Sequence, residues 1–191
     1  MEQNELIAGL KSHDEEAFKV LVEQFKDRIY NLCYSYVRNA AESEDLAQEV
    51  FIEVYNSIGR FNEKADLSTW IYRITINEAL QMIRKKKAQK RFGFVFSLFG
   101  NEEKYSSLHK EEVHPGVSLE NRERSRVLFS QIDKLAENQK NAFLLIKLEG
   151  KSYQEAADIM QTTVSSVESL MHRAKANLKK WLGSYYKITE L

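Results

Sequence analysis

One stretch of sequence, SYQEAADIMQTTVSSVESLMHRAKANLKKWL at residues 152–182, decides the fold that we predict. Ser152 and Glu155 have the spacing of a capping box, in which two side chains satisfy backbone N–H groups at the start of a helix. We predict that this helix ends near Met160 and that, after a short turn, a second helix covers 164–182. A helix, a turn of three residues and a second helix are typical of a helix-turn-helix, a motif that reads duplex DNA.

The second of these helices has an apolar face and a polar face. Val167, Met171 and Ala174 recur at steps of three or four, and we expect them to pack against the first helix, where Ala156 and Ala157 permit a close approach. Such a helix meets base edges and phosphates with its outward residues. Those residues are Ser165, Ser166, Glu168, Ser169, His172, Arg173 and Lys175. A plain antiparallel helix pair with solvated charges is the alternative.

The rest of the chain also has the periodicity of amphipathic helices. Apolar side chains recur every three or four residues in five further segments, which are 14–36, 41–58, 69–87, 120–133 and 137–148. Ser43 is a candidate cap for the second of these helices and Ser68 for the third. Gly183 is expected to end the last helix of the chain. The alternation typical of β-strands is weak, so we predict an all-α protein.

The predicted helices divide into two small domains joined by a flexible linker. Residues 1–92 form the first domain, residues 119–191 form the second, and residues 93–118 form the linker. Phenylalanines alternate with other residues around the start of the linker, at positions 92, 94 and 96, which predicts a short extended piece. A polar stretch with Pro115 and Gly116 follows.

A mixed aromatic and cationic surface is predicted around the helix 69–87. Its candidate DNA contacts are Trp70, Tyr72, Arg73, Asn77, Arg84 and Lys85, with Asn62 and Lys64 from the preceding loop. Unpaired bases stack on aromatic faces while cations follow the backbone, and a base turned out of a duplex needs a polar pocket. The loop 62–66 is a candidate for that pocket. The competing interpretation places the aromatic residues in the core and makes the basic run a solvated helix end.

The helix 41–58 carries a stretch of acidic residues. Four residues share a face roughly opposite its apolar stripe, namely Asp45, Gln48, Glu49 and Ile52. An exposed isoleucine among carboxylates and an amide is typical of a surface that docks on another protein. An ordinary solvated face is the alternative.

Composition and motifs argue against enzymes, metal proteins and membrane proteins. The 28 basic and 28 acidic residues give a net charge of zero, which argues against a uniformly basic coat for nucleic acid. The sequence has no phosphate-binding loop, nucleophile elbow or zinc-protease motif, and its four histidines lack metal-ligand spacing. We expect no catalytic residue, metal, cofactor or small-molecule substrate. Because the start resembles no leader and no run of about 18 apolar residues occurs, we expect a cytoplasmic protein.

Three segments resemble motifs of RNA polymerase sigma factors, in particular the extracytoplasmic-function (ECF) subfamily of the sigma-70 family. Residues 44–51, EDLAQEVF, are similar to the polymerase-binding segment of these proteins. Residues 67–74, LSTWIYRI, followed by Asn77 and the basic run 84–87, are similar to their helix for the promoter −10 element. Residues 153–182 resemble their helix-turn-helix for the −35 element.

This resemblance implies a role for each part of the chain. The first domain would be sigma region 2, a helical bundle, and the second would be sigma region 4. The acidic face, Asp45, Gln48, Glu49 and Ile52, would dock on the clamp helices of the largest subunit of core RNA polymerase. The loop 62–67 and Asn77 would capture a flipped base of the −10 element. An anti-sigma factor would hold the protein inactive.

The chain also departs from the usual pattern of this family. Gln81 and Met82 stand where an aspartate followed by a basic residue is frequent, and Thr163 and Ser165 stand where many members have proline and glycine. Glu168 replaces a residue that is frequently basic, and its carboxylate can accept a hydrogen bond from cytosine, so we expect a distinct −35 sequence. A free-standing helix-turn-helix regulator and an antagonist that mimics sigma domains are the competing classes.

Overall fold

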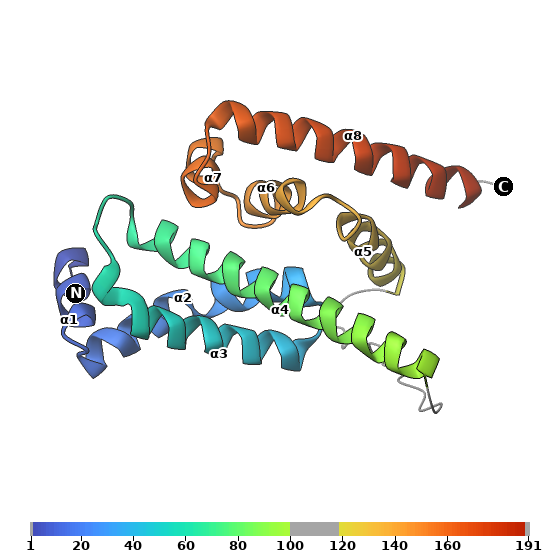
Figure 1. Cartoon of the computed structure of the whole chain (residues 1–191). Coiled ribbons are helices and arrows are strands. Elements are labelled where there is room, and N and C mark those ends of the chain that lie inside the picture. Colours follow the sequence, from blue (N-terminus) through green and yellow to red (C-terminus); the bar gives the residue numbers. More distant parts are fainter. Residues whose placement is uncertain (1, 100–118, 190–191) are drawn as a thin grey trace. The chain divides into compact units, whose positions relative to one another are not determined.

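The computed structural model describes residues 2–99 and 119–189, and the chain divides into two compact units, residues 1–112 and 113–191 (Figure 1). Within the described ranges every regular element is a helix, so the all-α prediction is confirmed. None of the helices found there is long and apolar enough to cross a membrane. Each unit has a core of its own.

The first unit is built on three long helices, α2 (Glu15–Val37), α3 (Ala40–Ser57) and α4 (Leu67–Phe99), which pack against one another. A short helix, α1 (Gln3–Lys11), packs on α2 and on the single-turn 3₁₀ helix η1 (Ile58–Arg60). The core side chains recur at helical spacing and include Leu21, Leu32, Val50, Val54 and Ile71. This packing of apolar faces, more than helix propensity, stabilises the helices.

Local caps set where α2 and α3 begin. Asp14 precedes α2, and its carboxylate accepts a hydrogen bond of 2.8 Å from the backbone N–H of Ala17. Asn39 caps α3 in the same way by accepting from the N–H of Glu42 at 2.9 Å, so the prediction of Ser43 as the cap is wrong. Ser43 lies inside the helix, where its hydroxyl donates to the carbonyl of Asn39. Asn39 has the extended backbone that a capping position needs.

α4 is longer at both ends than its sequence pattern predicts. The carbonyl of Asp66 accepts from the N–H of Trp70, so the helix already includes Ser68, which is not its cap. It continues to Phe99, so the first residues of the predicted linker are helical and not extended. No proline interrupts this stretch, and a brief alternation of phenylalanines fits a helix as well as a strand. The rest of the predicted linker, residues 100–118, lies outside the described residues.

α1 is a helix that we did not predict from the sequence. Leu6, Ile7 and Leu10 are buried and hold it on its neighbours. Gly9 permits a close approach between helices, because a Cβ at that position would lie 2.7 Å from the Cβ of Ala17. The three apolar residues do have helical spacing, but nine residues give too short a pattern to stand out.

The second unit consists of α5 (Leu119–Ile132), α6 (Glu137–Lys147), α7 (Tyr153–Met160) and α8 (Val164–Thr189). The first three of these helices all contact α8. The core of the unit contains Ile132, Leu144, Leu145, Val167 and Met171, each at most 1% exposed. The position of α7 against α8 therefore follows from a shared core that both helices bury.

The capping box predicted for α7 is confirmed. The N–H of Glu155 donates to the hydroxyl of Ser152 at 3.2 Å, and the N–H of Ser152 donates to the carboxylate of Glu155 at 2.8 Å. α7 ends at Met160 as predicted, and Gln161 then takes a left-handed conformation. The prediction that Gly183 ends α8 is wrong, because the helix passes through it and its φ lies outside the left-handed region that a terminating glycine uses.

Candidate nucleic-acid and protein interfaces

One face of α8 is buried in the core of the second unit, and the opposite face is exposed to solvent. Val167, Met171 and Ala174 are at most 1% exposed, which turns the intervening positions outward. The helix start is capped by Thr163, whose hydroxyl accepts a hydrogen bond of 3.2 Å from the N–H of Ser166. We did not predict this cap, although a threonine just before a helix is a known signal. The capped first turn is the part of a recognition helix that meets base edges.

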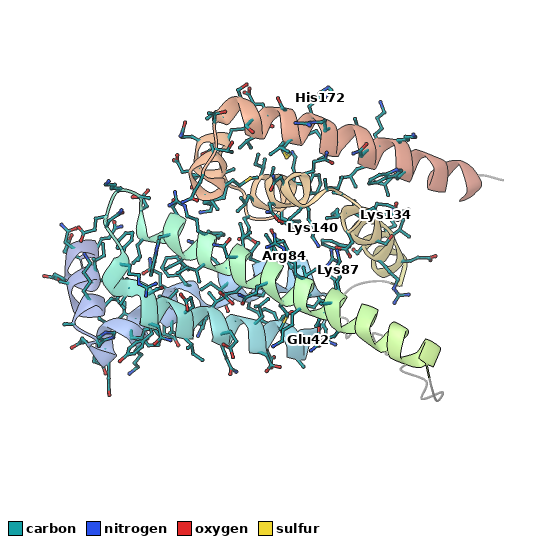
Figure 2. The ribbon with its side chains drawn as sticks, viewed as in Figure 1. Glu42, Arg84, Lys87, Lys134, Lys140 and His172 are labelled. Carbon is teal, nitrogen blue, oxygen red and sulfur yellow. The ribbon has the colours of Figure 1, made fainter. Side chains whose placement is uncertain are left out.

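The seven DNA-reading residues predicted on α8 all reach the surface. Ser166 is half-buried and the other six are exposed. Glu168, Ser169, His172 and Arg173 line one open hollow, and Figure 2 shows His172 on the outer side of the helix. Arg173 Nε donates to the carbonyl of Ser169 at 3.2 Å, which directs its guanidinium along the helix. The hollow therefore combines an acceptor for base amino groups with a donor for guanine or phosphate.

The residues predicted to read DNA from α4 separate by helical register. Trp70, Arg73, Asn77 and Arg84 follow one another at steps of three, four and seven residues, so they share one side of the helix. Trp70 and Arg73 are half-buried, while Asn77, Arg84 and the neighbouring Lys85 are exposed. This side of α4 offers an aromatic edge, an amide and cations along one line.

Tyr72 does not belong to that surface, and the prediction that it contacts DNA is wrong for this structure. Its side chain is only 4% exposed, and it shares a register with Ile76 and Ala79, which are 6% and 0% exposed. These three residues form the face of α4 that packs into the core of the first unit. A ring buried on that face has no surface on which a base could stack.

The loop before α4 carries two exposed candidates, Asn62 and Lys64. Asn62 Oδ1 accepts a hydrogen bond of 3.2 Å from the N–H of Lys64, which makes a tight turn. Between them, Glu63 has φ 57°, a left-handed conformation that residues with a Cβ rarely adopt. Phe61 is buried at the start of the loop, and its ring centroid lies 5.3 Å from that of Trp70. The loop is thus attached to the first turn of α4 by an aromatic pair.

The acidic face predicted on the second helix is exposed along α3. Asp45, Gln48, Glu49 and Ile52 all reach solvent, and Ile52 is 52% exposed. The other side of the helix is closed by apolar residues that are at most 2% exposed, namely Leu46, Val50 and Val54. A half-exposed isoleucine on a face of polar side chains is the arrangement expected where a protein partner binds.

Carboxylates of two helices come together beside this face. Burial raises the pKa of the half-buried Glu78 on α4, and the nearby carboxylates of Glu53 and Glu49 on α3 raise it further. Like charges at close range repel one another, and a cationic group from a partner would relieve that repulsion. The acidic face therefore suits a basic partner.

Part of the basic run at 84–87 is used inside the first unit. Lys86 forms an ion pair with Glu42 in the first turn of α3, and their side chains are 32% and 31% exposed. Arg84, Lys85 and Lys87 are exposed. The positions of Arg84 and Lys87 on α4 and of Glu42 on α3 can be followed in Figure 2. The exposed side chains of this run are therefore Arg84, Lys85 and Lys87, while Lys86 is half-buried beside Glu42.

The only cysteine of the sequence, Cys33, is buried in the first unit, and burial raises the pKa of its thiol to about 12. A thiol with that pKa stays protonated at neutral pH and is a poor nucleophile. Among the residues that the structure describes, no three histidine, cysteine, aspartate or glutamate side chains gather where they could hold a metal ion.

Comparison with known families matches both units. Residues 21–89 match Sigma-70 region 2, and residues 125–178 match Sigma-70, region 4. The solved structure of CnrH in complex with the cytosolic domain of CnrY is similar in fold, with a TM-score of 0.68, 20% identity and coverage of 95% of this chain and 97% of that one. The sigma factor RpoE in complex with the anti-sigma factor NepR from Bartonella quintana gives a TM-score of 0.63, 22% identity and coverage of 87% and 96%.

Curated relatives are similar over nearly their whole length. The chain is 33% identical over 178 residues to the ECF RNA polymerase sigma factor SigW of Bacillus subtilis, which covers 92% of this chain and 94% of that protein. It is 29% identical over 183 residues to the RNA polymerase sigma-H factor of Pseudomonas aeruginosa, with coverage of 95% and 94%. These matches run through both units, and the chain therefore belongs to the ECF RNA polymerase sigma factors.

Proposed function

We propose that this sigma factor docks on core RNA polymerase through the acidic face of α3, reads the −10 element with the loop 62–66 and α4, and reads the −35 element with the outer face of α8. The observation that carries the proposal is the position of the predicted residues. With Tyr72 excepted, each lies at least partly exposed on a helix or loop whose other side is closed by a core.

The −35 element would be read in duplex form. The first turns of α8 would enter the major groove, where Glu168 can accept from the amino group of cytosine and Arg173 can donate to guanine or to a phosphate. Ser165, Ser169 and Lys175 would complete the contacts, each of them exposed on the same helix. The remaining residues predicted to contact the −35 element, Ser166 and His172, lie on the same helix.

The −10 element would be read as separated strands. Asn62 and Lys64 would form the polar pocket for a base turned out of the duplex, and the exposed edge of Trp70 would contact a neighbouring base. Arg73 and Asn77 follow on the same side of α4, and Arg84 and Lys85 would attract the phosphate backbone. Tyr72 would contribute only through the core that positions this helix.

Polymerase binding would bring the two DNA-reading surfaces together. The clamp helices of the largest polymerase subunit would cover Ile52 and present basic groups to Asp45, Glu49 and the amide of Gln48. With a net charge of zero, the chain has little general attraction to DNA, so neither surface would bind a promoter tightly by itself. Joined on polymerase, each surface raises the effective concentration of the other at its element.

The domain boundaries that we propose follow from the same assignment. Region 2 would occupy residues 1–92 and region 4 residues 119–191, joined by residues 93–118. The matched ranges 21–89 and 125–178 fall inside these two domains and support the division. The protein would act in the cytoplasm, where polymerase is found, would use no cofactor, and would leave formation of the phosphodiester bond to polymerase. An anti-sigma factor would control it, as the complex of the sigma factor RpoE with the anti-sigma factor NepR suggests.

Run-off transcription with purified core polymerase tests the function. A randomised promoter pool should yield transcripts that depend on this chain and share a −10 and a −35 sequence. Strong, site-specific binding in a gel shift without polymerase would instead favour a free-standing regulator. A holoenzyme that is inactive on every promoter of the pool would favour an antagonist that mimics sigma factors.

Co-purification with core polymerase tests the docking face. Asp45→Lys combined with Gln48→Ala should abolish it, because the charge reversal places a cation against a basic partner. The matched control is Glu23→Lys with Gln24→Ala, which makes an equivalent charge reversal and the same Gln→Ala change at exposed positions of α2. Unchanged co-purification of the α3 variant would remove the docking assignment, and an equal loss in the control would show that the effect is not specific to α3.

The role of Arg173 is tested in the same assay. Arg173→Ala should weaken transcription only from promoters that need a −35 element, with Arg28→Ala, an exposed arginine of α2, as the control. An equal loss on promoters with and without that element would refute the assignment.

A further inference from the structure

The last turn of α1 touches the loop that we assign to the −10 element. Lys11, at the end of α1, forms an ion pair with Glu63, which lies 52 residues further along the chain. Its Nζ also lies 6.0 Å from the centroid of the Phe61 ring. One cation therefore contacts the loop at its aromatic start and again at its turn.

Both contacts fall where the loop needs support. Glu63 has the left-handed backbone of a strained residue, and such a conformation persists only where neighbouring groups hold it. Phe61 connects the loop to Trp70 in the first turn of α4. Lys11 thus acts on the turn that carries Asn62 and Lys64 and on the aromatic pair that fixes that turn to the helix.

Lys11 projects from an element that is itself firmly held. Leu6, Ile7 and Leu10 of α1 are 3–7% exposed, and Gly9 brings the helix close to Ala17 of α2. An ammonium group on a well-packed helix end has less freedom to lose than one on a loop when it forms an ion pair. The contact with Glu63 therefore restrains the loop rather than the helix.

We propose that Lys11 is a positioning residue, which holds the loop 62–66 in the conformation that presents Asn62 and Lys64 to the −10 element. The proposal rests on the assignment of this loop to promoter recognition. Without the ion pair the loop samples more conformations, and DNA binding must then order it, which weakens discrimination among −10 bases. Docking through α3 and reading by α8 do not depend on this contact.

Charge reversal tests the positioning role on the protein alone. Lys11→Glu and Glu63→Lys each place like charges together, while the double variant restores the pair with its charges exchanged. Amide hydrogen exchange in residues 62–66 should accelerate about threefold in each single variant. It should slow again toward the original rate in the double variant, which restores the ion pair but not the cation beside the Phe61 ring. An acceleration of about threefold is expected of an ion pair whose side chains are 35% and 55% exposed.

The matched control for this measurement is Lys26→Glu, which breaks the exposed ion pair between Lys26 and Glu23 within α2. It should leave exchange in the loop unchanged. Restoration by the exchanged pair also separates the contact with Glu63 from the loss of a cation at the end of α1, because the double variant still lacks that cation. Loop exchange that Lys11→Glu does not change, or that the double variant does not restore, overturns the proposal.

Transcription then tests whether positioning matters for promoter choice. The readout is the run-off ratio between a preferred promoter and versions with single −10 substitutions. It should fall about threefold with Lys11→Glu, as expected for a partly exposed ion pair, and recover in the double variant.

Asn62→Ala separates the positioning role of Lys11 from the assignment of the loop to the −10 element. If it lowers the ratio and Lys11→Glu does not, the positioning role fails and the loop assignment stands. If neither lowers it, the loop assignment fails and the positioning role fails with it.

Discussion

The two DNA-reading regions of this sigma factor are built in different ways. The recognition face of α8 depends on neighbours in the sequence, because Ser152 and Glu155 cap α7 and Thr163 caps α8, each across three residues. The loop 62–66 of the first unit, which we propose reads the −10 element, is instead contacted by Lys11, 52 residues from the glutamate that it binds. A motif made of local contacts can be recognised from sequence, whereas a loop held by a distant helix needs the fold to explain it.

The largest expected effect comes from the core beneath the helix-turn-helix. Leu144→Ala should lower the free energy of unfolding of the second unit by about 2–5 kcal/mol, because Leu144 is 0% exposed and its loss leaves a cavity. Denaturant unfolding followed by the fluorescence of Trp181, with Trp70 replaced by phenylalanine, would measure it. Reading of the −35 element should fail with the fold of this unit.

The matched control for that change is Leu148→Ala in the same unit. Leu148 is 46% exposed, so the same truncation should cost well under half as much. Equal losses from the two variants would show that Leu144 does not occupy a closed core, and the local construction of this unit would then need another explanation.

The next effect tests whether α1 supports the loop 62–66. Gly9→Ala would bring a Cβ within 2.7 Å of the Cβ of Ala17, a group attached directly to the backbone that cannot move aside cheaply. We expect a net loss of about 1–2 kcal/mol in the stability of the first unit, since overpacking outweighs the better helix propensity of alanine. Urea unfolding would measure it, and hydrogen exchange in residues 62–66 should accelerate as α1 loosens.

Gly59→Ala is the control for that experiment. A Cβ on Gly59 would meet nothing within 4 Å, so the change should alter stability by no more than about 0.5 kcal/mol. A Gly9→Ala variant that is as stable as the original protein, with normal loop exchange, would mean that α1 has room on α2 and does not govern the loop.

The features that sequence predicts well here are those with a local physical signal. The α7 capping box, the three-residue turn and the alternation of buried and exposed positions on α8 are all contained in 31 consecutive residues. The acidic face of α3 follows from helical register alone, since Ile52 and its polar neighbours are opposite the apolar stripe. For these features the pattern and the structure agree because no distant part of the chain decides the outcome.

The features that sequence misses depend on tertiary contacts. Tyr72 belongs to a mixed stretch in which aromatic type alone does not say whether the ring is inside or outside, and packing against α2 and α3 places it inside. Asn39 and Ser43 are both good capping residues, and the chain reversal after α2, with Arg38 in a left-handed conformation, selects the first. The ion pair between Lys11 and Glu63 has no sequence pattern at all.

A smaller change in stability tests where α8 ends. If the helix runs through Gly183, then Gly183→Ala should stabilise the second unit by about 0.5–1 kcal/mol, because alanine loses less backbone entropy and a Cβ there meets nothing within 4 Å. If the helix ended at Gly183 in a left-handed conformation, the same change would destabilise it. The sign of the change in thermal stability therefore decides between the two helix ends.

The smallest effect concerns the capping box that makes the second unit locally defined. The N–H of Ser152, followed by its hydroxyl, lowers the pKa of the Glu155 carboxyl below its ordinary value of 4.5. The stability that the ionised Glu155 carboxylate contributes is therefore fully present above the ordinary pKa of 4.5. It is lost as the pH falls through the lowered pKa of the folded protein. Glu155→Ala should cost about 0.5 kcal/mol at pH 7, the low end for a hydrogen bond because the carboxylate is exposed to solvent, and less at acid pH.

The control is Glu155→Gln, whose side chain accepts a hydrogen bond but does not titrate. The difference in stability between the glutamine and alanine variants should therefore not change with pH. Thermal melts from pH 7 to pH 3 would measure both gaps. A gap between the original protein and Glu155→Gln that stayed constant over this range would mean that the carboxylate charge adds nothing to the cap.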